Sequence, residues 1–272
     1  MGERLVRSVR VVEAPSAGST VTGRRGRRPS APWLLGTIRA GFRQLAQLRR
    51  GPALHPYGLT CAAELEVVDD GGGLWGVPWL DEPGRYETTV RLSRAAGLPG
   101  RLPDGLGLAL RVEGAAGPGR PFDLLLTSSG RGRVGRHLPQ PRTDVLSGPY
   151  SSLLPYRVGG HSSLLAAFPR RTRREPVRGD LTSLREVLTA GTLVFDLCAE
   201  TSGRAWRAFA VLTVGAPLPV PPTESLDSDI YTHSGRGFRP GSALAAIRRA
   251  AYRGSQADRR EKGRPGRIPD GR

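Results

Sequence analysis

The stretch LTCAAELEV, residues 59–67, alternates strongly apolar side chains with smaller or charged ones along its whole length. Its apolar positions are Leu59, Cys61, Ala63, Leu65 and Val67, and both glutamates fall on the opposite face. Because successive side chains of a β-strand point to opposite faces, this period of two predicts a strand with one buried face. Three consecutive glycines after it predict where the strand ends.

The same period recurs further along the chain. The expected strands cover residues 87–93, 105–113, 121–128, 192–200 and 205–214, and a helix is expected from Asp180 or Ser183 to about 190. In the stretch 105–113 the bulky residues face one way and Gly105, Gly107 and Ala109 face the other. Mostly antiparallel strands with few helices indicate an α+β protein, built as a closed barrel or as a sandwich.

Both ends of the chain differ from this middle part. Residues 1–31 are expected to be a basic, disordered tail, residues 32–50 an amphipathic helix, and residues 256–272 a polar basic tail. A proline-rich linker is expected at 216–222, and a last helix at about 241–253.

The net charge of +17 lies mainly in these ends. Residues 1–50 carry 11 arginines against two glutamates, and residues 248–272 carry nine basic side chains against three acids. Basic tails bind nucleic acid or anionic membranes weakly through their charge. Arginine usage with only one lysine, together with 37 glycines and 24 prolines, also indicates a GC-rich coding sequence, which explains the charge without any partner.

Several functional classes find no support in the sequence. No apolar run reaches the roughly 18 residues of a membrane span, and no signal peptide is recognised, so a cytoplasmic protein is expected. The two cysteines are expected to be inert buried thiols, and the four histidines lack metal-site spacing. Gly130, Gly132 and Gly135 form a GxGxxG, but prolines follow where a dinucleotide site needs a helix, so a solvated basic turn is expected.

Several segments, taken in order, resemble haem catalases. They are HPYG (55–58), VRLS (90–93), PDGLGLALRV (103–112), DLLLTS (123–128), YSSLLPYRVG (150–159) and GFRPGSALAAIRRAAY (237–252). The resemblance implies that residues 51–255 form a catalase-like antiparallel closed β-barrel with flanking helices, ending in a proximal helix. It also implies a haem cofactor, a peroxide or other small-molecule substrate, and self-association.

On one side of the implied haem the resemblance assigns three residues. His55 matches the distal histidine that acts as acid and base on peroxide, and Ser93 matches the serine that orients its imidazole. Arg91 matches an arginine that pairs with a haem propionate.

On the other side, Tyr252 matches the tyrosinate that ligates the iron, and Arg248 matches the arginine four residues before it. Positions four apart are neighbours on a helix, and an arginine beside a phenol favours the phenolate. A surface arginine and a buried tyrosine on an amphipathic helix would give the same pattern.

Departures from the family leave three interpretations open. Thr127 stands where catalases have an asparagine, and Gly254 and Ala257 stand where an Asp and an Arg are usual. The chain is therefore expected to be a haem-dependent, peroxide-consuming oxidoreductase, a non-catalytic barrel that binds haem or another apolar ligand, or an interaction protein that uses its basic tails on nucleic acid or anionic membrane.

Overall fold

The computed structural model describes residues 57–171, 173–202, 205–222, 226, 230 and 232–242. The expected tails, the amphipathic helix over 32–50 and the last helix fall outside these residues, apart from the first two positions of that last helix. Among the described residues, no helix is long and apolar enough to cross a membrane.

The strands expected from period two are all present, most with slightly different bounds. They are β1 (Tyr57–Val67), β2 (Arg85–Arg94), β3 (Asp104–Val112), β4 (Phe122–Ser128), β10 (Leu193–Glu200) and β11 (Trp206–Pro217). Consecutive partners pair antiparallel, and the Ser202 turn connects β10 to β11 as expected.

Shorter elements went unrecognised in the sequence. They are α2 (Pro78–Asp81), a 3-10 turn (Gly135–His137), β5 (Pro141–Arg142), β6 (Tyr150–Ser151), β7 (Tyr156–Val158), β8 (His161–Ser163), β9 (Leu165–Pro169) and β12 (Phe238–Pro240). Apart from β9, these strands have only two or three residues, which is too few to display a period, so only the pairing partner identifies them.

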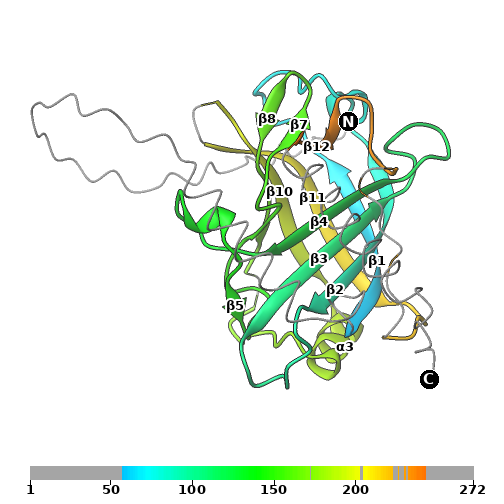
Figure 1. Cartoon of the computed structure of the whole chain (residues 1–272). Helices are drawn as coiled ribbons and strands as arrows, with labels where there is room; N and C mark the ends of the chain where they lie inside the picture. The colour runs from blue at the N-terminus through cyan, green and yellow to red at the C-terminus, as the bar shows by residue number, and fades with distance from the viewer. Residues whose placement is uncertain are drawn as a thin grey trace, which may run out of the picture. The chain divides into compact units, whose positions relative to one another are not determined.

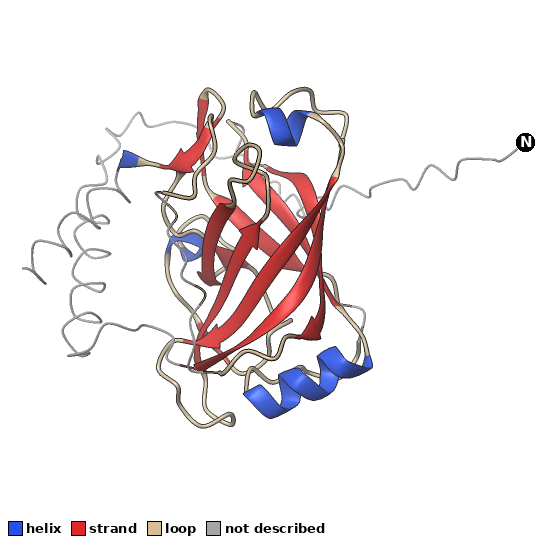
Figure 2. Cartoon of the chain, turned by 90° about the vertical axis from the view of Figure 1, so that its right-hand side faces the viewer, coloured by secondary structure: helices blue, strands red, loops and turns tan. Residues whose placement is uncertain are grey.

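The sheet closes on itself. The strand order β2-β1-β11-β10-β9-β6-β4-β3 is completed by pairing between β2 and β3, which makes an eight-stranded antiparallel barrel (Figure 1). The closed barrel, rather than the sandwich, is therefore the correct alternative. A small sheet, ordered β12-β7-β8, lies beyond one end of the barrel, and α3 (Leu181–Ala190) lies at the other (Figures 1 and 2).

Register decides which side chains fill the barrel. One cross-strand row joins Leu59, Leu92, Leu108 and Leu126, and all four are buried. Residues one position away on each strand therefore face outward. Packing against these inward leucines is the main source of stability, because burial of apolar area is the dominant favourable term in folding.

The helix α3 begins at Asp180, one of the two starts that the sequence allowed. The Asp180 carboxylate accepts from the Ser183 backbone N–H at 3.0 Å, while Leu184 and Leu188 are buried. The alternative capping box starting at Ser183 is not used. Because the cap satisfies an N–H that would otherwise lack a helical partner, it defines the start of the helix.

The expected linker 216–222 is partly wrong. Pro217 still belongs to β11, the Leu218 N–H donates to the Thr60 carbonyl at 2.8 Å, and the Gly58 N–H donates to the Pro222 carbonyl at 3.0 Å. The segment therefore follows the edge of β1, since prolines are tolerated where no N–H is required.

Neighbouring leucines on β4 test the inward and outward assignment. Leu124 is 2% exposed and Leu125 is 41% exposed. Leu124→Ala should lower the free energy of unfolding by about 2–5 kcal/mol, because it leaves a cavity in the barrel. Leu125→Ala should lower it by less than about 1 kcal/mol. Urea unfolding measures both, and equal losses would contradict the assigned register.

Candidate functional site

One row of residues crosses the outer face of the barrel at the expected site. Gly58, Ser93, Gly107, Thr127 and Ser151 are cross-strand partners in turn on β1, β2, β3, β4 and β6. Antiparallel pairing in register is what brings these residues, far apart in the sequence, into one line.

Gly107 makes a gap in that row. Ser93 and Thr127 flank it from the two neighbouring strands, so they lie two strand spacings, or roughly 10 Å, apart. In the next outward row Ala109 lies between Arg91 and Leu125. The outward side of β2–β4 therefore carries small residues in its middle, with a hydroxyl on each side and one guanidinium beside them, and of these residues Arg91, Ser93 and Gly107 are buried.

Arg91 is 4% exposed although it faces away from the barrel core. Its Nη2 donates to the Pro222 carbonyl at 2.9 Å. Burial lowers the pKa of the Arg91 guanidinium, because removal from water disfavours the charged form. A carboxylate placed beside this side chain would favour the charged form again.

Space for the Arg91 guanidinium depends on Gly58. A Cβ at position 58 would lie 2.6 Å from Arg91 Cζ and 2.8 Å from the Leu92 carbonyl oxygen. Both distances are shorter than van der Waals contact, so no larger residue fits without movement. The glycine in the segment HPYG thus has a steric reason that is visible only in the barrel.

The two hydroxyl residues differ in their surroundings. Ser93 is 9% exposed, whereas Thr127 is partly exposed and its Oγ1 donates to the Leu106 carbonyl at 3.2 Å. A hydroxyl has one hydrogen to donate. In this arrangement the Thr127 hydrogen is directed to the backbone of β3.

The structure thus brings Arg91, Ser93 and Thr127 together on one face. His55, Arg248 and Tyr252 lie outside the described residues. The roles that the resemblance implies for those three remain predictions.

The cysteines occupy the places expected of them. Cys61 and Cys198 are both buried and unpaired. Burial raises the pKa of each thiol to about 12, so the thiolate is scarce near neutral pH.

The glycine-rich loop after β4 is only partly the solvated turn expected from the sequence. Gly130 packs against Gly135 and donates its N–H to the Gly135 carbonyl at 2.9 Å, and a single 3-10 turn follows. Arg131 and Arg133 are exposed, but Arg136 is buried. The prediction that Arg136 is solvated is therefore wrong. Arg136 is buried because its Nη1 pairs with Glu200 Oε1 at 2.9 Å and its guanidinium lies over the Trp206 ring.

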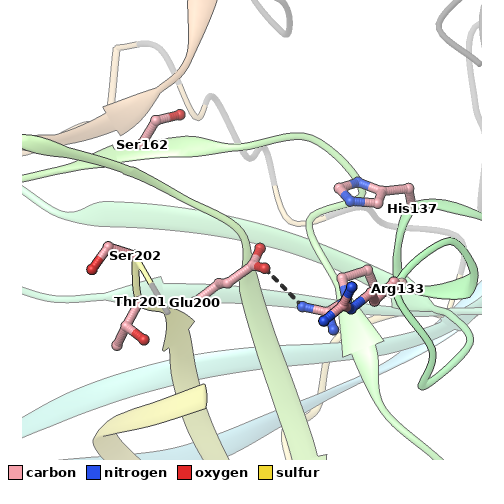
Figure 3. A pocket seen from close by; sticks show the side chains of 7 residues that line it. Arg133, His137, Ser162, Glu200, Thr201 and Ser202 are labelled. Atoms are coloured by element: carbon pink, nitrogen blue, oxygen red, sulfur yellow. Dashed lines mark hydrogen bonds and ion pairs between the residues drawn. The ribbon is translucent and has the colours of Figure 1, made fainter. Parts of the chain in front are cut away.

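A cavity of about 260 Å³ opens beside this loop (Figure 3). Its walls come from three separate parts of the chain and comprise Arg133, Arg136, His137, Ser162, Glu200, Thr201 and Ser202. The His137 Nδ1 lies 2.9 Å from the Leu153 carbonyl, which favours the tautomer that carries its proton on Nδ1. No single stretch of sequence contains this grouping, so no local motif could have indicated it.

Comparisons with known proteins show similarity in fold but no similarity to a known sequence family. No known protein family and no curated protein sequence matches the chain. Among solved structures, it is similar to a fungal catalase, with a TM-score of 0.54, 12% identity and coverage of 85% of this chain and 64% of that one. It is also similar to catalase A from Saccharomyces cerevisiae, with a TM-score of 0.51, 11% identity and coverage of 84% and 65%.

These similarities confirm the catalase-like barrel. The chain spans less than two thirds of the length of each of these two catalases. At such identities the likeness concerns the fold alone, and function has to be argued from the site.

The contact between Gly58 and Arg91 leads to a stability test. Gly58→Ala should lower the free energy of unfolding by about 1–3 kcal/mol, because the added methyl overpacks a filled space. Gly160→Ala is the matched control, since a Cβ there meets no atom within 4 Å. The control should change stability by less than about 1 kcal/mol. Chemical denaturation compares the two, and an unaffected Gly58→Ala would argue against the packing of Arg91.

Proposed function

We propose that this chain is a catalase-like haem-binding protein and that the haem lies against the outer face formed by β1–β4. The observation that carries the proposal is the row through Ser93, Gly107 and Thr127 beside Arg91. The segments that resemble catalases in sequence supply these positions, and they fall on one face of a barrel whose fold resembles two catalases.

The described residues fit a flat, largely apolar macrocycle with acidic substituents. Gly107 and Ala109 add almost no side-chain bulk to the middle of the face, and Leu125 offers apolar surface next to them. Arg91 supplies a guanidinium at the border, and guanidinium groups bind carboxylates through paired hydrogen bonds.

The resemblance to catalases implies a role for His55, Ser93, Arg248 and Tyr252. When bound, haem would supply the redox-active iron. His55 would hold and move a proton at its imidazole, and Ser93 would orient that ring through a hydrogen bond. Tyr252 would provide a phenolate ligand, with Arg248 favouring the deprotonated phenol.

A non-catalytic haem-binding barrel is the second candidate, and Thr127 favours it. The asparagine amide that catalases have here can donate two hydrogens, whereas the one hydrogen of Thr127 is directed to the Leu106 carbonyl. Polarisation of bound peroxide from this side would therefore be weaker. Binding and turnover need separate measurements for this reason.

Absorption spectra test the binding proposal. The full chain, titrated with hemin, should develop a Soret band, and Tyr252→Phe should lose or shift it because the phenolate ligand is gone. Tyr57→Phe is a suitable control, since Tyr57 is an exposed tyrosine at the start of β1. Absence of the band in the unaltered chain would refute haem binding.

Peroxide decomposition by the hemin-loaded chain tests the catalytic step. His55→Ala should lower turnover by about 100-fold or more while the Soret band persists, because a general acid–base group is lost but the iron ligand is kept. Thr127→Asn should raise turnover if the threonine is the limiting departure. Undetectable turnover in every variant would favour the non-catalytic barrel, and turnover unchanged in His55→Ala would contradict the role of His55.

A further inference from the structure

A buried charged cluster lies one row further along the same face of the barrel. Asp123 on β4 is 0% exposed, and its two carboxylate oxygens accept from Arg111 Nε and Nη2 on β3, each at 2.9 Å. Arg111 and Asp123 are cross-strand partners, so this bidentate pair follows from the register. A carboxylate without access to water requires such partners.

His233, more than one hundred residues later, joins the cluster. Its Nδ1 lies 2.8 Å from Asp123 Oδ2, and its backbone carbonyl accepts from the Asp123 N–H at 2.9 Å. Its Nδ1 is also 3.1 Å from Arg111 Nη2. The shorter contact to a carboxylate favours a proton on Nδ1, so the imidazole donates to Asp123.

A second anchor follows a few residues later. Phe238, which is buried, stacks on Phe122 with ring centroids 4.6 Å apart, and Phe122 is the residue before Asp123 on β4. The Gly159 N–H donates to the Gly237 carbonyl at 2.7 Å, and β12 pairs with β7. Residues 232–240 are thus held to β4 by two contacts of His233 with Asp123, one through the side chain and one through the backbone, and by the stacking of Phe238 on Phe122, and β12 is also paired with β7.

We infer that the hydrogen bond from His233 to Asp123 is a latch that docks residues 232–240 on the barrel, and that His233 is thereby a positioning residue for the chain that continues to Tyr252. The part concerning Tyr252 rests on the proposed function. Tyr252 follows Pro240 by only twelve residues, so the anchored segment sets where that chain starts.

The strength of this latch matters because the segment has little regular structure of its own. The strand β12 has three residues and pairs only with β7, which is equally short. Segments with few contacts open locally as cooperative units while the rest of a protein stays folded. Loss of the His233 side-chain hydrogen bond should therefore raise the open population of residues 232–240 without opening β1–β4.

Amide hydrogen exchange on the full chain tests the docking. His233→Ala should increase exchange in residues 232–240 about tenfold or more, with exchange in β1–β4 unchanged. His233→Asn should recover most of the protection, because its amide nitrogen can donate in place of Nδ1. Asp196→Asn is the control, since it breaks an ion pair with Arg170 elsewhere on the barrel and should leave residues 232–240 unaffected.

Hemin titration of the same variants tests the positioning. The apparent Kd for hemin varies inversely with the closed fraction of residues 232–240, which the exchange measurement gives for each variant. It should therefore rise in His233→Ala by the factor by which that closed fraction falls, and return toward the original value in His233→Asn. Unchanged exchange in His233→Ala, or no recovery in His233→Asn, would overturn the latch. A closed fraction that falls severalfold with an unchanged Kd would overturn the positioning role.

An unaltered chain that binds no hemin would overturn the proposed function and the positioning role together. The exchange measurement would still decide the docking of residues 232–240, because it needs no ligand. The two failures are therefore distinguishable.

Discussion

Pairing between β2 and β3 closes the sheet, and the rest of the molecule depends on that closure. A closed barrel leaves no unpaired edge and forces alternate residues of each strand either into the packed interior or onto the outer face. Much of the interior is filled by apolar rows such as Leu59, Leu92, Leu108 and Leu126, while Arg94 and Asp104 form a buried ion pair on the same side of β2 and β3. The candidate site lies on the outer face.

The outer face combines features that have no purpose in a simple barrel. Arg91 is buried, although a charged side chain has a lower solvation free energy in contact with water. Gly58 leaves the space that the Arg91 guanidinium occupies. A flat strip through Gly107 and Ala109 gives up the packing area that larger residues would provide. Under the proposed function, a ligand lying on this face would pack against that strip.

Three side chains on this face carry the two candidate functions. Thr127 directs its hydroxyl to the backbone of β3, and Arg91 and Ser93 lie on the same face of β2. The contact between Asp123 and His233 also holds residues 232–240 against β4, the strand that carries Thr127. Under the proposed function, binding and catalysis would depend on different residues of this one surface.

Much of this was readable in the sequence, because period two and the spacing of glycines are local properties. They identified the long strands and placed Gly107 and Ala109 on the face opposite the bulky residues of their strand. Capping residues indicated the helix before residue 190 but left its start open between Asp180 and Ser183. The tertiary structure alone decided barrel against sandwich, the pairing of β6 with β9, and the burial of Arg136 against Glu200. It alone joined Asp123 to His233, since contacts between residues far apart depend on register and chain closure, which no local pattern encodes.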